Sequence, residues 1–403
     1  MQDTLLHIYW LPTALAFGAA AYAVLAVVAS LVSAARAAAA ERPAAPTSVS
    51  VLKPLCGAEP RLFENLATFC EQTHPCFELI CGVSRADDPA IAIVHRLQAA
   101  YPRCPISLVV DPRIHGTNLK VSNLINLAEW AHHDVFVLAD SDIAVEADYL
   151  MRVCAPLSDA RVGIVTCLYR AKGIAGYWSR VGAQFINEWF VPSVRVAHLF
   201  GSTRFGFGAT LALRRTTLER IGGFQRLRNT LADDFWLAGH VRELGLQTVL
   251  SPVVVETDVT ENTLGALWDR ETRWLRTIRS VNRAGFTFLF VTITLPWMLC
   301  GAWLAYALHG AHAMLSGGLA VATVAGIAAR VILHSMMRGG RDGFWRDLAL
   351  LPVRDVLLFA QWVAGSFGST VVWRGVRVPV VETDNAAVFR REPVEALEVT
   401  EGH

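Results

Sequence analysis

The chain has 403 residues, of which 53% are hydrophobic and only 18% are charged, whereas an ordinary soluble protein has a charged fraction nearer a quarter. Its 36 basic and 35 acidic residues leave a net charge of +1, which excludes the basic footprint that nucleic-acid binding requires. The apolar residues are gathered in blocks, and this indicates segments that cross a membrane.

The first apolar block runs from about Ile8 to Val32 and is long enough to cross ~30 Å of hydrocarbon as a helix. A cleaved signal peptide is the alternative, but the block exceeds the usual apolar region and no basic segment precedes it. Arg36 and Arg42 follow the block. Because positive charge accumulates on the cytoplasmic side, residues 1–46 are predicted to be an uncleaved anchor and linker that precede a cytoplasmic domain.

Residues 47–283 alternate short apolar runs with helix-like stretches, and we expect them to form one domain. The predicted strands are Val49–Leu52, Phe77–Val83, Ile106–Val110 and Val135–Ala139, and the predicted helices are Arg61–Glu71 and Pro89–Tyr101. Strands that alternate with helices predict a doubly wound α/β domain with a mostly parallel sheet. The ligand site of such a domain lies at the carboxyl ends of its strands.

Residues 284–375 are apolar again and are predicted to form membrane-spanning or interfacial helices. The expected segments are spans over about Phe286–Leu308, Ala313–Met336 and Val356–Trp373, and an interfacial stretch over Phe344–Asp355. Arg330 lies inside the second span and must face the bundle interior or reach the interface. Three spans would put the basic tail, 376–403, outside the cell, so a re-entrant segment is the alternative.

The strongest local signal is Asp140-Ser141-Asp142, which directly follows an apolar strand. Two carboxylates separated by one residue suit a hard divalent cation, Mg²⁺ or Mn²⁺, that bridges the diphosphate of a nucleotide sugar. The alternative is a solvated turn, because Asp and Ser are common in loops. The place at the end of a buried strand favours the metal-binding interpretation.

Two further acidic pairs begin predicted helices. Asp87-Asp88 precedes Pro89, so Asp88 either caps a helix, contacts a nucleotide at the same sheet edge, or does both. Asp233-Asp234 opens a helix that continues through Leu244. A helix amino terminus stabilises the carboxylate as an anion, as a general base requires, although simple capping explains this pair equally well.

Arginines recur every three residues before the late apolar segments, at Arg270, Arg273, Arg276 and Arg279, with Trp274 among them. On a helix this spacing forms a drifting basic stripe whose members lie close together. One interpretation is a clamp on a departing diphosphate, with Trp274 as the floor of an acceptor site. The alternative is that these arginines meet anionic lipid beside a span.

Five motifs, taken in chain order, resemble one known family. They are Lys53-Pro54-Leu55-Cys56-Gly57, Asp88, Asp140-Ser141-Asp142, Asp234 and Arg270-x-x-Arg273-Trp274. Their order and spacing resemble the membrane-bound ceramide glucosyltransferase-like enzymes, glycosyltransferase family 21. The resemblance implies a GT-A fold flanked by transmembrane helices, and an inverting transfer of a hexose from a UDP-sugar to a lipid.

The resemblance also implies roles for individual residues. The residues that bind the donor would be Asp88, Asp140, Lys120, Lys53 and Asp233, and Asp140 with Asp142 would hold the metal. Asp234 would be the general base, and Arg270, Arg273 and Trp274 would close the diphosphate and acceptor region.

Some positions depart from the ceramide enzymes. Val191-Pro192 stands where they have His-Pro, and Asp140-Ser141-Asp142 where Asp-Ser-Gly is common. The segments Leu52–Glu59 and His115–Asn123 look more like the bacterial hopanoid-biosynthesis branch. That branch is associated with adding N-acetylglucosamine to bacteriohopanetetrol, and it implies a multi-pass protein of the bacterial inner membrane.

Three alternatives remain open at this point. A ceramide glucosyltransferase would use UDP-glucose and ceramide. A processive polysaccharide synthase shares the acidic motifs, but it would need more spans to build a polymer channel. A non-catalytic membrane scaffold is disfavoured by the intact set of carboxylates.

Overall fold

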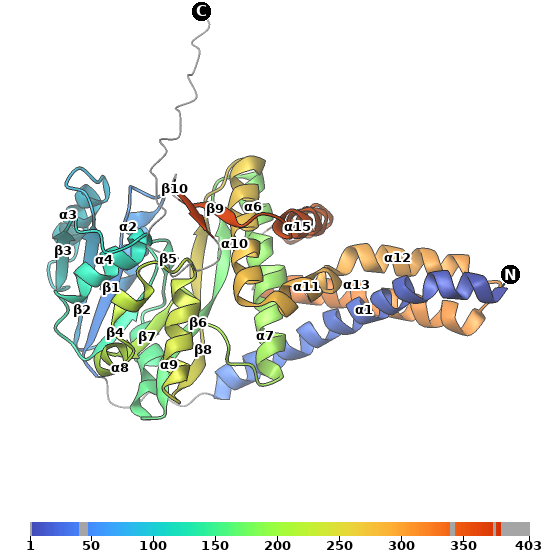
Figure 1. Cartoon of the computed structure of the whole chain (residues 1–403), viewed down its shortest axis with the longest axis horizontal. Coiled ribbons are helices and arrows are strands. Elements are labelled where there is room, and N and C mark those ends of the chain that lie inside the picture. Colours follow the sequence, from blue (N-terminus) through green and yellow to red (C-terminus); the bar gives the residue numbers. More distant parts are fainter. Residues whose placement is uncertain (1, 40–46, 339–342, 374–375, 380–403) are drawn as a thin grey trace, which may run out of the picture.

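An α/β domain and a bundle of long apolar helices lie at opposite ends of the chain's long axis (Figure 1). The computed structural model describes residues 2–39, 47–338, 343–373 and 376–379. Arg42 and most of the expected tail, 380–403, lie outside the described residues. The expected α/β domain with apolar helices on both sides of it in sequence is confirmed.

One eight-stranded sheet organises the domain, in the order β3-β2-β1-β4-β7-β6-β8-β5. Its strands are β1 Val49–Pro54, β2 Phe77–Val83, β3 Ile106–Val110, β4 Val135–Leu138, β5 Ile143–Ala144, β6 Val162–Gly173, β7 Leu211–Arg214 and β8 Gln247–Val259. The first four strands are parallel to one another, as are β6 and β8. Because β7 runs antiparallel to both β4 and β6, the sheet is mixed.

Helices and short helical turns cover the two faces of this sheet. They are α2 Leu62–Cys70, α3 Ala90–Ala100, α4 Leu119–Ala128, α5 Tyr149–Cys154, η1 Ala155–Ser158, α8 Arg215–Arg220, η3 Phe224–Leu227 and α9 Asp233–Glu243. The predicted strands β1 to β4 and the helices α2 and α3 are confirmed to within two residues at each end.

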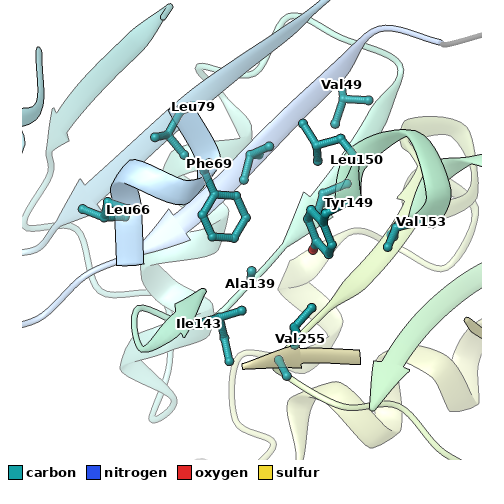
Figure 2. Close-up of a cluster of buried hydrophobic side chains, with 14 of the residues drawn as sticks. Val49, Leu66, Phe69, Leu79, Ala139, Ile143, Tyr149, Leu150, Val153 and Val255 are labelled. Carbon is teal, nitrogen blue, oxygen red and sulfur yellow. The ribbon is translucent and has the colours of Figure 1, made fainter. Parts of the chain in front are cut away.

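Alternate residues of β4 belong to different hydrophobic cores. Val135 and Val137 join one core, whereas Phe136 and Leu138 join the other, as expected for a parallel strand buried on both faces. In the first core, Phe69 of α2 and Tyr149 of α5 pack edge to face with ring centroids 5.7 Å apart (Figure 2). This core lies beside Ala139 and supports the turn that follows β4.

Four helices connect the domain to the apolar bundle. They are α6 Tyr177–Gln184, the π-helix η2 Phe185–Phe190, α7 Val191–Leu199 and α10 Leu264–Val281. The bundle itself contains α1 Gln2–Ala39, α12 Thr294–Ala307 and α13 Ala313–Arg338, which lie side by side (Figure 1). By length and composition, three helices among the described residues could cross a membrane, or up to four if a bent pair forms one span.

The predicted span Phe286–Leu308 is not one straight helix. It is divided into α11 Arg283–Thr292 and α12, which meet at a bend of 49°. Pro296 explains the break, because it has no N–H to offer the carbonyl of Thr292 and its ring crowds the preceding turn. The carboxylate of Asp355 accepts the N–H of Leu295 at 3.0 Å and so satisfies the new helix start.

The prediction of a span over Val356–Trp373 is wrong in its bounds. Helix α15, Leu351–Gly365, follows the short α14, Phe344–Leu348, and ends well before Trp373. Thr370–Trp373 is instead strand β9, which pairs with β10, Val376–Pro379. Gly368, with a φ of 82°, turns the chain between the end of α15 and the start of β9. The segment 344–365 is long and apolar enough to span, but α15 is viewed along its axis in Figure 1 and so lies across the direction of α1, α12 and α13.

Arg330 faces the inside of the molecule, as its place in an apolar helix required. Its guanidinium donates to the backbone carbonyl of Glu188 at 2.8 Å and pairs with Asp355 at 3.2 Å. Burial of this arginine is therefore compensated by partners from η2 and α15.

Candidate active site

The turn after β4 brings together residues from three separate segments. The Nζ atom of Lys120, in the first turn of α4, lies 2.6 Å from Oδ1 of Asp140 and 3.6 Å from Oδ2 of Asp233. Asn118 caps α4 by accepting the N–H of Val121 at 3.0 Å, and its amide donates to Oδ1 of Asp233 at 3.3 Å. The helix cap and the ion pairs thus hold three of the predicted site residues together: Lys120, Asp140 and Asp233.

Lys120 stays a cation at this place. Burial alone would lower the pKa of Lys120, but the carboxylates of Asp140, Asp233 and Asp234 outweigh burial and raise it. A positive charge therefore lies among the three carboxylates.

The Asp234 carboxylate is held by two backbone N–H groups, from Gly208 at 2.9 Å and Phe235 at 2.8 Å. Burial and the neighbouring Asp233 raise the pKa of Asp234 to about 6, and the charge of Lys120 limits the rise. At neutral pH this group is mainly an anion with a pKa close to the working pH, which suits a general base.

Asp142 belongs to the same turn, and Lys53 of β1 lies against that turn. Asp142 Oδ2 accepts the hydroxyl of Thr257 at 2.7 Å, and burial together with Asp140 raises the pKa of Asp142 to about 7. Burial lowers the pKa of Lys53 to about 7. The Nζ atom of Lys53 lies 3.7 Å from the centroid of the Phe69 ring and donates to the backbone carbonyl of Asp140 at 2.8 Å. Lys53 therefore supports the turn from within the core.

The donor chemistry of Asp140 and Asp142 fits a hard divalent cation. The Asp140 carboxylate disfavours ionisation of Asp142, and a cation between the two would relieve that repulsion. In the part of the chain that the structure describes, no cluster of three or more His, Cys, Asp or Glu side chains could hold a metal. A cation here would thus need water and substrate oxygens to complete its shell, as Mg²⁺ commonly does.

Asp88 joins two loops at the edge of the sheet. Its carboxylate accepts the N–H of Gly57, which follows β1, at 3.0 Å and the N–H of Ala90, at the start of α3, at 2.9 Å. The side chain of Asp88 thus bonds the first N–H of α3, but the helix begins at Ala90 with Pro89 at its N-cap position, one residue later than expected. The contact with Gly57 places Asp88 at the loop after β1, which is the sheet edge expected to face a nucleotide.

The arginines of α10 divide into two groups. Arg270 donates to Glu261 at 2.6 Å and lies 5.0 Å from the centroid of the Trp274 ring, whereas Arg273 is half-buried on the same helix. Arg276 and Arg279 instead donate to backbone carbonyls of the segment 365–370 that follows α15. The stripe is therefore not a single anion clamp.

The segment after α15 reaches the neighbourhood of the carboxylates. Val371 in β9 is buried and packs against Leu231, three residues before Asp234. Arg276 and Arg279 thereby anchor a strand that lies against the loop leading to Asp234.

Two features of the site were not predicted from the sequence. A Cβ atom at Gly208 would lie 2.7 Å from Oδ2 of Asp140 and 3.0 Å from Nζ of Lys120, so a larger residue there would displace this ion pair. Tyr169 of β6 lies within electrostatic reach of Asp234 and Asp140, which together with burial raise its pKa. The Gly-Phe-Gly sequence at 206–208 was a usable signal for the first feature, whereas Tyr169 lies in a strand that the apolar runs did not reveal.

An α/β domain with carboxylates gathered at the carboxyl end of β4, next to an arginine-tryptophan helix, matches the class of enzyme that the resemblance implied. The chain belongs to glycosyl transferase family 21, whose profile matches residues 13–386. The expectation of a sugar-transferring family is thus confirmed.

Curated relatives include two proteins of Caenorhabditis elegans. Ceramide glucosyltransferase 3 is 22% identical over 232 residues, which cover 57% of this chain and 50% of that protein. Ceramide glucosyltransferase 1 is 23% identical over 229 residues, which cover 57% and 49%. The chain thus spans about half the length of these relatives.

Among solved structures, similarity is found to a mannosyltransferase from Pyrobaculum calidifontis in complex with GDP-Man and Mn²⁺. Its TM-score is 0.49 and its identity 20%, with 88% of this chain and 99% of that chain covered. GalNAc-T7 with UDP, GalNAc and Mn²⁺ gives a TM-score of 0.41 at 11% identity, with 62% and 51% covered.

Proposed function

We propose that this protein transfers a sugar from a UDP-sugar to a hydroxyl group of a membrane lipid, with inversion at the anomeric carbon. The observation that supports this most directly is the convergence of Lys120, Asp140, Asp233 and Asp234 at one point of the sheet edge. A base with a pKa of about 6 and a fixed cation within one site suit the removal of a proton next to a charged donor.

In the proposed reaction the acceptor oxygen attacks the anomeric carbon while the bond from that carbon to the diphosphate oxygen breaks. Asp234 takes the proton of the acceptor hydroxyl, and UDP leaves with the electron pair of the broken bond. Lys120 and Arg270 stabilise the charge that develops on the diphosphate. Such stabilisation, together with the orientation of both substrates, accounts for most of the rate.

Asp140 and Asp142 would hold Mg²⁺ or Mn²⁺, which stabilises negative charge on the diphosphate when bound. Asp88 and the loop after β1 would contact the uridine nucleotide, and Lys53 would support the metal-binding turn from within the core. Arg273 and Trp274 would close the acceptor side.

The helices that flank the domain support a membrane lipid as the acceptor. Helices α1 and α13 are apolar enough to span, and Arg36 lies in the last turn of α1. By the positive-inside rule, the end of α1 that carries Arg36 faces the cytoplasm, and so does the catalytic domain that follows it. We infer a multi-pass protein of the bacterial inner membrane whose acceptor enters from the bilayer.

For the acceptor, we propose a hopanoid polyol such as bacteriohopanetetrol, with UDP-N-acetylglucosamine as the donor. The sequence motifs favour that branch, and Val191, at the position of the histidine of ceramide enzymes, is buried among apolar residues at the start of α7. The second candidate is UDP-glucose with ceramide, which the names of the curated relatives favour.

The test is to incubate the purified full-length protein with either UDP-sugar, a hopanoid polyol or ceramide, and Mg²⁺ or Mn²⁺. Mass spectrometry of the lipids is expected to show a hopanoid with one added N-acetylhexosamine. A glucosylated ceramide as the only product would replace the first acceptor by the second. Release of no UDP with any lipid would contradict the transferase proposal and support the scaffold alternative.

A further inference from the structure

Arg354 of α15 is a buried arginine that none of the sequence motifs includes. Its side chain is 1% exposed, and its Nη1 atom donates to Oε2 of Glu271 at 2.6 Å, where Glu271 itself is fully buried. Its Nη2 atom donates to Oε1 of Gln361, about two helical turns along α15, also at 2.6 Å. The guanidinium is thus fixed by two short directional bonds.

Glu271 follows Arg270 directly, within the Arg-x-x-Arg-Trp motif on α10. Its second oxygen, Oε1, lies 3.7 Å from Nη2 of Arg270. Glu261 holds the Nη1 atom of the same arginine from the other side at 2.6 Å. Gly182 of α6 leaves room for Arg270, since a Cβ atom there would lie 3.1 Å from its Nη2 atom. Arg354 therefore influences Arg270 through one shared carboxylate.

A second connection runs through aromatic rings. The guanidinium of Arg354 lies 5.4 Å from the centroid of Phe185, the first residue of the π-helix η2. The Phe185 ring packs against Trp274 with centroids 5.7 Å apart, and Trp274 in turn lies 5.0 Å from the guanidinium of Arg270. Both connections end at the same Arg270–Trp274 pair.

Two hydrogen-bond donors of Arg270 are unpaired among the described residues. Its Nε and Nη2 atoms are buried and have no hydrogen-bond partner among the described residues. Because unpaired buried donors are costly, an anion that came within hydrogen-bond distance of these two atoms would be stabilised. The orientation of these two donor atoms depends on Glu261, Glu271 and Trp274. Arg354 contacts Glu271 directly and Trp274 through Phe185.

We propose that Arg354 is a positioning residue that orients Arg270 and Trp274 toward the β-phosphate of the nucleotide. The proposal rests on the proposed function, because it takes Arg270 to be a diphosphate ligand. Buried ion pairs add little net stability compared with apolar replacements, but they fix geometry. Arg354 thereby makes the diphosphate contact depend on the docking of α15 against α10.

The test compares the affinities of the full-length protein, in lipid nanodiscs, for UDP and for UMP by calorimetry. These ligands differ by the β-phosphate alone, so the ratio of their dissociation constants isolates that contact. The variants are Arg354→Met, Arg354→Lys and Arg270→Met. The double variant Arg354→Met/Glu271→Met is added because it leaves no buried carboxylate unpaired and so folds even if Arg354→Met does not.

Arg215→Met is the matched control. Arg215, the first residue of α8, lies 4.5 Å from the Phe136 ring centroid and donates to the backbone carbonyls of Ala131 and His133, which precede β4, whereas Asp140 follows β4.

In the wild type, UDP is expected to bind more tightly than UMP. The Arg354→Met and double variants should lose about tenfold in UDP affinity, the size of one charge-assisted hydrogen bond, and keep their UMP affinity. Arg354→Lys should fall between, since it lacks the planar fork, and Arg270→Met should lower UDP affinity at least as much as Arg354→Met. Folded variants with a wild-type UDP-to-UMP ratio would overturn the positioning role. A wild type that binds neither nucleotide would instead contradict the proposed function.

Discussion

The backbone N–H of Gly208 donates to the carboxylate of Asp234 at 2.9 Å, while the α-carbon of the same glycine leaves no space for a side chain beside Asp140. One backbone position thus contacts the candidate base and the candidate metal ligand together. The loop before β7 sets the distance between the acceptor side and the donor side of the site.

Gly208→Ala should therefore damage transfer more than stability. The added methyl group would lie 2.7 Å from Oδ2 of Asp140 and 3.0 Å from Nζ of Lys120, so the ion-paired ends of these two side chains must shift. We expect kcat to fall by at least about tenfold, a loss of ~1.4 kcal/mol in transition-state stabilisation. Gly265→Ala is the control, since nothing lies within 4 Å of a Cβ atom there. An equal change of kcat in both variants would contradict this role of Gly208.

Lys120→Met should weaken donor binding and slow transfer. Without Lys120, the carboxylates of Asp140, Asp233 and Asp234 face one another with no cation between them, and the pKa of Asp234 rises further. Lys172→Met removes an exposed lysine of β6 and serves as the control. UDP affinity, measured by calorimetry, should fall about tenfold or more in the first variant and remain unchanged in the second. Equal affinities would rule out a donor-side role for Lys120.

The rate of transfer should fall as the pH falls through about 6. Burial and Asp233 raise the pKa of Asp234 to about 6, so below this pH the base carries a proton and cannot accept another. The logarithm of kcat should then decline by about one for each pH unit. Asp233→Asn removes a like charge and should move this decline to lower pH. A profile that is flat between pH 5 and 7 would be incompatible with Asp234 as the base.

Chelation of divalent metals should abolish transfer, and added Mg²⁺ or Mn²⁺ should restore it. Asp142→Asn removes one of two carboxylate ligands, so the metal concentration at half-maximal rate should rise about tenfold or more. Asp159→Asn, which removes a carboxylate exposed near Arg161, should leave the metal requirement unchanged. Full activity after exhaustive chelation would exclude the proposed metal site.

The first half of the domain could be predicted from the sequence because β1, β2 and β4 are buried on both faces and read as continuous apolar runs. Asp140 follows such a run, and its place in the site was therefore predictable. Strand β6 mixes Thr166, Tyr169 and Arg170 with apolar residues and has no comparable pattern. Tyr169 was missed for this reason.

Contacts between distant segments could not be predicted from local patterns. The Glu271–Arg354 pair joins residues 83 positions apart, and no spacing rule along one element detects it. The segment after Gly365 was expected to be helical because apolar counts do not distinguish a helix from the β-branched strand β9. Pro296 was a usable signal for the broken helix at Thr292.

The central claim is that Asp234 removes the proton of a lipid hydroxyl while UDP leaves. It is tested most directly by measuring glycolipid product and released UDP for the wild type and for Asp234→Asn, with UDP affinity as the control for folding. The wild type should form product and UDP in equal amounts, and the folded variant should bind UDP but lose at least about a hundredfold in rate, as removal of a general base does. Wild-type-like transfer by Asp234→Asn would contradict the account.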